Sequence, residues 1–310
     1  MTTDTKPIPI LHRAATALYR RRWLRLSLLL ALPVTWIVGV YGGSLIALLA
    51  QSFYALNPFT GTVDNKLTLD TWRTLFTEAN RAVMLRTIGM ATSVTIACVV
   101  IAFPLAYYMA RYASRRAKYL LVLAVLIPLW SSYLVRVYSW KLILAADGII
   151  NWFVQRAGLD RVLGAILDTP VVGGPSLSIS YLGQFLVFTY IWLPYMVLPI
   201  HSSLERVPRS FLEASADLGA HSATTFRRII WPLAIPGVAA GSIFTFSLTL
   251  GDFVIPTIIG DSSPFIGLAI YSYQGVAGNL PLAAAFSFVP IAVMALYLTG
   301  ARKLGAFDAL

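Results

Sequence analysis

Few side chains of this sequence have the types and the spacing that catalytic chemistry requires. The single cysteine, Cys98, lies inside an apolar run, and the three histidines, His12, His201 and His221, are scattered at the edges of apolar runs. Neither a disulfide framework nor a zinc site can be built from such a set, and we expect Cys98 to behave as a small buried hydrophobe. The sequence therefore predicts that the chain is not an enzyme and holds no metal.

One acid lies inside an apolar run and is a candidate for binding chemistry. Asp252 follows a stretch of uncharged residues that is long enough to cross a membrane. An ionisable group at that depth is costly and usually faces a partner or a watery cavity. We predict that Asp252 belongs to a solute path or gate. The alternative is a structural pair with Arg136 or Lys141.

Aromatic side chains form a second candidate feature in an earlier apolar run. Five of them recur at spacings of four, three, four and three residues: Tyr181, Phe185, Phe188, Trp192 and Tyr195. This spacing places all five rings on one helix face, where they serve either as packing or lipid contacts or as a pore lining. A pore lining would attract a cationic solute by about 0.5 to 2 kcal/mol per cation–π contact. Trp130 and Tyr133 extend this candidate path, although an interfacial aromatic belt explains them equally well.

A polar segment around residue 213 carries helix signals. Ser210 followed three residues later by Glu213 is a capping box, which predicts a helix that begins one residue after Ser210 and ends at Gly219. A second helical turn is expected to begin near Ser222 and to end before Pro232. The segment is thus predicted to be a helix, a sharp turn and a helix.

Two acids of the first predicted helix suggest a docking surface. Glu213 and Asp217 are four residues apart and share one helix face. Like charges at this spacing cost a few tenths of a kcal/mol unless a cation lies opposite, so this face is expected to meet a basic partner. In the simpler alternative, Glu213 only caps its own helix and Asp217 is solvated.

The elements that position these residues are membrane-spanning helices. The 310 residues are 58% hydrophobic and only 12% charged, with mean hydropathy +0.74, which is too apolar for a soluble domain. Crossing a bilayer takes roughly 20 apolar residues as a helix. Six segments qualify, at about 26–50, 87–110, 119–135, 177–200, 234–257 and 282–301, and they predict an all-α polytopic membrane protein. The net charge of +11 does not indicate nucleic-acid binding, because the chain has no polar domain.

The orientation follows from the distribution of basic residues, which are retained on the cytoplasmic side. Sixteen of the 24 Lys and Arg residues lie before the first span, in the loops after the second and fourth spans, and after the sixth, together with five acids. The opposite loops and span ends balance at eight basic and eight acidic residues. We therefore predict cytoplasmic termini, a basic cytoplasmic segment 1–25 that lies against the bilayer, a six-span domain 26–303 with a cytoplasmic loop at about 204–236, and a tail 304–310.

The cytoplasmic loop resembles the EAA loop of ABC-importer permeases. The matching positions are Glu213-Ala214-Ser215, then Gly219, nine residues, Ile229 and Pro232. The family pattern is Glu-Ala-Ala, three residues, Gly, nine residues, Ile, one residue and Leu-Pro, so Ser215 and Trp231 depart from it. The resemblance implies a coupling helix that docks in a separate ATPase. No GxxxxGK[ST] phosphate-binding loop occurs in this chain, so ATP and Mg are expected on that partner and no cofactor on this chain.

The resemblance extends over roughly 106–260 and is nearest to spermidine/putrescine-type permeases. It rests also on the segments 136–140, 148–151 and 251–256. It implies the type I ABC importer permease fold in a bacterial inner membrane. The implied partners are two copies of the ATPase, a second permease forming a heterodimer, and an external solute-binding protein. The implied solute is putrescine or spermidine, and the alternative is a secondary transporter or channel that works without an ATPase.

Overall fold

The computed structural model describes residues 22–303 with gaps at 58, 65, 171 and 262. The described chain is helical apart from one short hairpin, in which β1 (Ala55–Leu56) pairs antiparallel with β2 (Val63–Asp64). Most of the predicted basic segment 1–25 and the predicted tail 304–310 lie outside the described residues.

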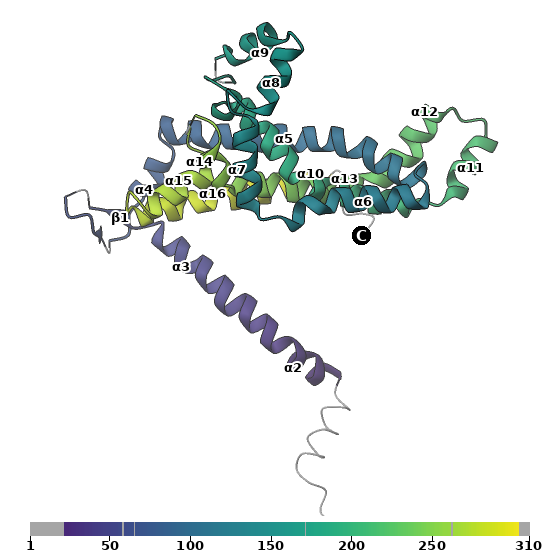
Figure 1. Ribbon diagram of the computed structural model, residues 1–310. Helices are drawn as coiled ribbons and strands as arrows, with labels where there is room; N and C mark the ends of the chain where they lie inside the picture. The colour runs from purple at the N-terminus through teal and green to yellow at the C-terminus, as the bar shows by residue number, and fades with distance from the viewer. Residues whose placement is uncertain (1–21, 58, 65, 171, 262, 304–310) are drawn as a thin grey trace, which may run out of the picture.

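Long helices form a bundle, from which α2 and α3 diverge (Figure 1). β1 and α4 lie at one end of the bundle, α11 and α12 lie at the other, and α8 and α9 project from its side. The long helices are α2 (Arg22–Thr35) and α3 (Gly43–Gln51), joined by a π-helical stretch Trp36–Gly42, then α5 (Glu78–Arg111), α6 (Arg115–Trp130), α7 (Tyr133–Ile143), α10 (Tyr181–Glu205), α13 (Trp231–Gly251) and α16 (Leu280–Lys303). The short helices are α4 (Asp70–Leu75), α8 (Ile149–Arg156), α9 (Asp160–Leu167), α11 (Arg209–Asp217), α12 (Ser222–Thr225), α14 (Val254–Ile258) and α15 (Ile266–Gln274).

Five helical runs of the described chain are long and apolar enough to cross a membrane, and α6 with α7 makes a sixth when this pair is counted as one broken span. The predicted set of spans is therefore present. Several boundaries differ from the prediction. The second span begins at Glu78, and the fifth run begins at Ser222 within the loop 204–236.

The third span is broken, where the sequence predicted one span over about 119–135. α6 and α7 meet at 97°. Pro128 lies in the last turn of α6, and Ser131 is extended at φ −83° and ψ 152° while its hydroxyl donates to the Pro128 carbonyl at 2.8 Å. A helix ends readily where a side chain satisfies one of its last carbonyls. The break turns α7 across the end of the bundle.

The fifth span also ends earlier than predicted. α13 stops at Gly251 because Asp252 is extended, at φ −72° and ψ 134°. The Asp252 carboxylate accepts a hydrogen bond from the backbone N–H of Ile255 at 2.9 Å, which satisfies a free donor at the start of α14. Asp252 is thus a junction between two helices rather than a residue inside one span.

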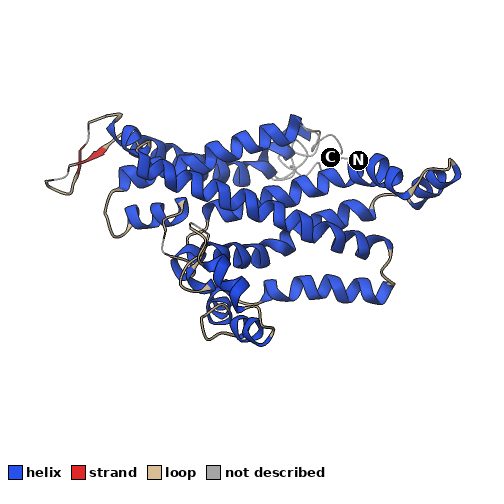
Figure 2. Cartoon of the chain, turned by 90° about the horizontal axis from the view of Figure 1, so that it is seen from above, coloured by secondary structure: helices blue, strands red, loops and turns tan. Residues whose placement is uncertain are grey.

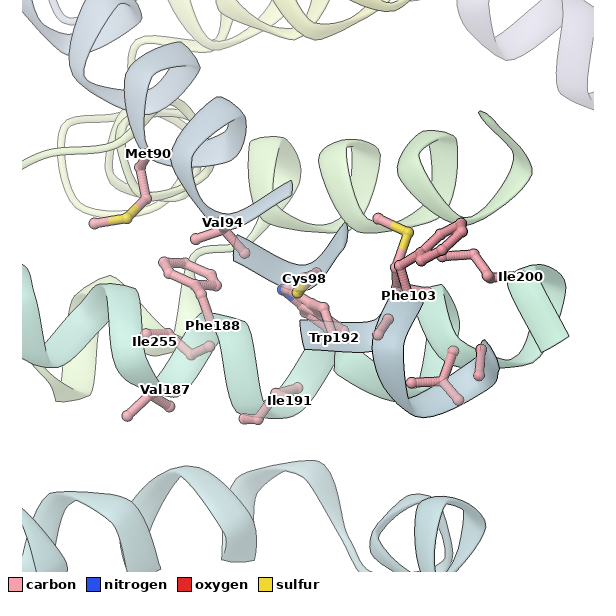
Figure 3. Packing of buried hydrophobic residues seen from close by; sticks show 14 of the residues in the cluster. Met90, Val94, Cys98, Phe103, Val187, Phe188, Ile191, Trp192, Ile200 and Ile255 are labelled. Carbon is pink, nitrogen blue, oxygen red and sulfur yellow. The ribbon is translucent and has the colours of Figure 1, made fainter. Parts of the chain in front are cut away.

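The core lies between α5, α10 and α13, which pack against one another. Figure 2 shows the long helices of the bundle side by side. Buried side chains of α5 meet those of α10 in the close view of Figure 3, where Cys98 lies near Trp192. Cys98 is fully buried, and its thiol donates to the Thr189 carbonyl at 3.6 Å, as expected of a small buried side chain. The packing of these three helices fixes the position of Asp252 at one end and of the loop 204–236 at the other.

Two glycines of α13 allow its close approach to α10. A Cβ added at Gly237 would lie 2.5 Å from the Pro199 carbonyl oxygen, and one at Gly241 would lie 2.7 Å from the Met196 sulfur. Small residues at such crossings let helix backbones touch in lipid, where packing replaces the hydrophobic effect. The pair therefore fixes the distance between the fourth and fifth spans.

The first span contributes little to this core. No residue of its most apolar window between Leu26 and Gln51 is buried, and the run leans away from the bundle in Figure 1. The end of this run, α3, contacts α16. A second buried cluster around Phe286 joins residues of α4, α15 and α16 with residues of α5 and α13.

Replacing Gly237 by Leu should destabilise the bundle, because the new side chain meets backbone rather than a flexible side chain. We expect a loss of about 1 to 3 kcal/mol, measured as a lower midpoint of thermal unfolding in detergent. Gly89→Leu is the matched control, since a Cβ at Gly89 meets nothing within 4 Å and Leu is the better helix former. Equal midpoints for the two variants would contradict the packing described for Gly237.

Candidate functional site

The predicted docking loop forms a helix that projects from one end of the bundle. α11 and α12 lie at the right-hand end of Figure 1, beyond the ends of α5, α6, α10 and α13. The side chains of Glu213, Ala214 and Asp217 are exposed, and Leu218 just after the helix is 88% exposed. An exposed helix face that combines two acids with apolar residues is suited to binding another protein.

The start of α11 differs from the prediction. The helix begins at Arg209 with Pro208 as its N-terminal flanking residue, and Ser210 makes no capping hydrogen bond. The capping box assigned to Ser210 and Glu213 is therefore wrong. Pro208 has φ −64° and an extended ψ of 143°, so its ring already holds the chain where a helix can start.

The end of α11 is as predicted. Gly219 has φ +72°, a conformation that favours glycine, and its N–H donates to the Ala216 carbonyl at 2.8 Å. The next N–H, that of Ala220, donates to the carbonyl of Ser215 at 3.0 Å. These bonds satisfy carbonyls at the helix end and turn the chain sharply toward α12.

Ser215 replaces the second alanine of the family pattern, and its side chain is buried. Its hydroxyl lies 2.8 Å from the Thr225 hydroxyl, which joins α11 to α12. Sequence reasoning did not identify Thr225, because a pair ten residues apart across a turn has no periodic signal. The bond fixes the angle between the two helices of the loop.

The second helix of the loop does not end before Pro232, contrary to the prediction. It runs from Ser222 to Gly251 without a break. A π-helical turn, Phe226–Ile230, ends two residues before Pro232, and such wide turns accommodate a residue that lacks a backbone N–H. Ile229 is half-buried, whereas its neighbour Ile230 is the residue that enters the core.

Aromatic rings join the base of this loop to α5. The Phe226 ring packs edge-on against Phe103 at 5.7 Å between centroids, and Trp231 lies 5.4 Å from the same ring. Trp231, the second departure from the family pattern, therefore has a packing partner. Beside α11, a cavity of about 350 Å³ is lined by Arg206, Phe211 and Pro236 among others.

Charged side chains fasten the end of α10, from which the loop departs. Glu205 forms an ion pair with Lys118 at the start of α6, and the imidazole of His201 lies 3.7 Å from the same carboxylate. The Arg111 guanidinium, at the end of α5, donates to two backbone carbonyls in this region. Sequence reasoning missed Arg111, because basic residues are common at cytoplasmic span ends.

At the opposite end of the bundle, Asp252 meets Tyr133 of α7. The Tyr133 hydroxyl donates to one carboxylate oxygen, and the Ile255 N–H donates to the other. Arg136 lies 6.0 Å from the Tyr133 ring centroid. Among the described residues Asp252 forms no ion pair with Arg136 or Lys141, so the alternative of a structural pair is not observed and a tyrosine contact takes its place.

The aromatic stripe of α10 divides into two parts. Phe188 is fully buried and packs against Phe265, which agrees with the packing interpretation of the stripe. Tyr181 stacks on Phe265 at 6.1 Å and donates to the Arg86 carbonyl at 3.1 Å. Phe185 is half-buried against the core.

The other two stripe residues belong to the Asp252 region. Trp192 stacks on Tyr133 with 5.8 Å between centroids and 22° between planes, and Tyr195 packs against Trp192 at 5.8 Å. Trp130 is 82% exposed at the end of α6 and does not join this group. The structure thus brings Asp252, Tyr133, Trp192 and Tyr195 together from three spans.

This arrangement of helices is the type I ABC importer permease fold. A chain of the bacterial alginate ABC transporter, solved in complex with an alginate pentasaccharide-bound periplasmic protein, superposes with TM-score 0.70 over 94% of this chain and 96% of that chain. The two sequences are 16% identical, so the likeness concerns the fold. It confirms the predicted fold class.

Sequence similarity identifies the family. Residues 102–303, which include α11, match the binding-protein-dependent transport system inner membrane component, and the chain belongs to this family. It is 53% identical over 302 residues to the inner membrane ABC transporter permease protein YdcU of Escherichia coli (strain K12), covering 97% of this chain and 96% of that protein. It is 31% identical over 232 residues to the spermidine/putrescine transport system permease protein PotB of the same organism, covering 74% and 80%. The chain is thus the permease subunit of an ABC importer in the inner membrane.

Replacing Ser215 by Ala should loosen the docking helix, because the Thr225 hydroxyl loses its partner. We expect a loss of about 1 kcal/mol, seen as roughly fivefold faster hydrogen exchange of the α11 amides. Ser210→Ala is the control, because a capping serine would cost about as much whereas Ser210 makes no capping bond. Faster exchange in the Ser210 variant would show that Ser210 caps the helix, and would contradict the helix start described here.

Proposed function

We propose that this permease carries a polyamine such as putrescine or spermidine, or a similar small cationic solute, into the cytoplasm by alternating access. The solute assignment is supported by the likeness to PotB and by the aromatic rings around Asp252. Carboxylates and aromatic faces are the groups that attract ammonium cations. In this proposal ATP is hydrolysed by a separate subunit, with Mg bound there.

The observation that carries the coupling proposal is the exposed acidic face of α11. Glu213 and Asp217 lie on a helix that is held at a fixed angle by the Ser215–Thr225 bond and is exposed beyond the bundle. We infer that this face docks on a cytoplasmic ATPase, present in two copies. The loop 204–236 and both termini are then cytoplasmic, which agrees with the sixteen basic residues on that side.

Further partners follow from the same proposal. A second permease would complete the pore as a heterodimer, and an external binding protein would deliver the solute. The alignment with a permease crystallised with its periplasmic protein is compatible with such an assembly. A secondary transporter would require no docking helix, and it would move solute in liposomes without an ATPase.

We further propose that Tyr133 and Asp252 form a gate on the solute path. The Tyr133 hydroxyl occupies the Asp252 carboxylate and holds α7 against the junction of α13 and α14. An ammonium group of the solute would compete for this carboxylate while the rings of Tyr133, Trp192 and Tyr195 face it. Solute binding would then release α7. Phe185, Phe188, Tyr181 and Trp130 would have supporting rather than direct roles.

Reversing the charge of the α11 face tests the coupling proposal. The Glu213→Arg, Asp217→Arg double variant should lose co-purification with the ATPase and at least tenfold of labelled putrescine uptake. The Glu78→Arg, Asp168→Arg double variant is the control, because these two acids are also exposed but lie outside α11. Normal uptake by the α11 variant, or uptake by the wild type without any ATPase, would refute the coupling proposal.

Two single variants test the gate. Asp252→Asn should reduce putrescine uptake at least tenfold, because it removes the negative charge that the ammonium group would bind. Tyr133→Phe keeps the ring but removes the hydroxyl, so ATP hydrolysis without solute should rise several-fold. Tyr138→Phe is the control, since Tyr138 lies on α7 with its side chain 55% exposed. If Tyr133→Phe hydrolyses ATP at the wild-type rate, the gate is disproved even where Asp252→Asn is inactive.

A further inference from the structure

Arg111 joins three elements at the cytoplasmic end of the bundle. It is the last residue of α5, and its Nη2 atom donates to the Leu204 carbonyl and to the Val207 carbonyl, each at 3.1 Å. Leu204 belongs to the last turn of α10, while Val207 lies in the turn that leads to α11. One guanidinium therefore bridges the end of a span and the segment from which the docking helix starts.

The chemistry of this contact makes it strong and directional. The last carbonyls of a helix have no partner within the helix and carry the negative end of its dipole. A guanidinium is a fixed planar donor that remains charged, so it can bind the Leu204 carbonyl at the end of α10 together with the Val207 carbonyl in the turn. Leu204 is fully buried and Val207 nearly so, and water has little access to compete for these bonds.

The neighbouring charges hold only α10. The Lys118–Glu205 ion pair ties α6 to the end of α10, one residue after Leu204. It does not reach the turn before α11. Among the side-chain hydrogen bonds of the described residues, those of Arg111 are the ones that connect α5 with that turn.

The other end of α5 is fastened to outer elements of the protein. The Thr87 hydroxyl accepts a hydrogen bond from the Ile266 N–H at 2.9 Å, at the first residue of α15. One residue earlier, the Arg86 carbonyl accepts from Tyr181 at the start of α10. From Thr87 to Arg111, α5 spans about 36 Å as one helix. It therefore connects the turn before the docking helix to the segment that follows Asp252.

We propose that Arg111 is a positioning residue that passes the displacement of α11 to α5 and thereby to α15. The inference rests on the proposed coupling of α11 to an ATPase. Without Arg111 the docking helix still binds, because none of its exposed residues changes, but its movement is no longer passed to α5 through the turn that precedes it.

The test compares the Arg111→Gln and Arg111→Lys variants with an Arg116→Gln control in the full importer in nanodiscs. Arg116 is an exposed arginine near the start of α6. Hydrogen exchange with and without Mg-ATP is followed in 209–217 and in 266–274, together with putrescine uptake per ATP hydrolysed. Arg111→Gln should keep the nucleotide-dependent change in 209–217, lose it in 266–274, and lower uptake per ATP at least fivefold. Arg111→Lys, which keeps the charge without the planar fork, should be intermediate.

The outcomes separate this inference from the proposed function. If the wild type associates with the ATPase and Arg111→Gln transmits the change to 266–274, only the inference is overturned. If Arg111→Gln does not accumulate in the membrane, Arg111→Lys decides, and wild-type uptake per ATP in that variant overturns the inference. If the wild type itself binds no ATPase and shows no nucleotide-dependent exchange, both the proposed function and the inference fail.

Discussion

The structure depends on one constraint, which is that backbone groups in a bilayer must find partners within the protein. At three helix ends of the described chain a side chain supplies a partner for a backbone group. The Ser131 hydroxyl does so at the end of α6, and the Asp252 carboxylate does so at the start of α14. The hydroxyl of Ser180 accepts from the Gly183 N–H at 3.0 Å at the start of α10. Two of these helix ends adjoin the group around Asp252. The same side chains that provide partners for the backbone therefore also shape this site.

The two ends of the molecule are connected by the same rigid core. α5, α10 and α13 interlock along their lengths, with Gly237 and Gly241 setting the separation of α10 and α13. α13 continues from the loop helix without interruption, and α10 leads into α11 through a short turn. Elements at the α11 end of the bundle therefore share helices with those around Asp252. Such sharing gives an importer permease a physical route between its two faces.

The sequence was sufficient for features that depend on local composition. Apolar runs predicted the spans, and Gly219 predicted the end of α11, because both signals act over a few residues. The helix start predicted from Ser210 was wrong. The spacing from Ser210 to Glu213 is that of a capping box, but the helix starts after Pro208, two residues earlier. The helix end predicted from Pro232 was also wrong, because a π-helical turn accommodates its missing backbone N–H and the helix continues.

Contacts between distant residues could not be predicted in this way. Tyr133 and Asp252 are 119 residues apart, and their contact depends on the 97° bend between α6 and α7. The partners of Arg111 are backbone carbonyls, which every residue carries, so no side-chain pattern points to them. The aromatic stripe was correctly placed on one helix, but only the fold separates Phe188 in the core from Trp192 beside Tyr133.

The single cysteine has a practical consequence for spectroscopy. Cys98 is the sole thiol of the 310 residues. It is fully buried, and its thiol donates a hydrogen bond to a backbone carbonyl. Maleimides and methanethiosulfonates react with accessible thiolates, and this one is enclosed by three helices. The native chain should therefore react very little with spin labels and fluorophores that target thiols. Cysteines introduced on exposed surfaces can report distances without the removal of a core residue.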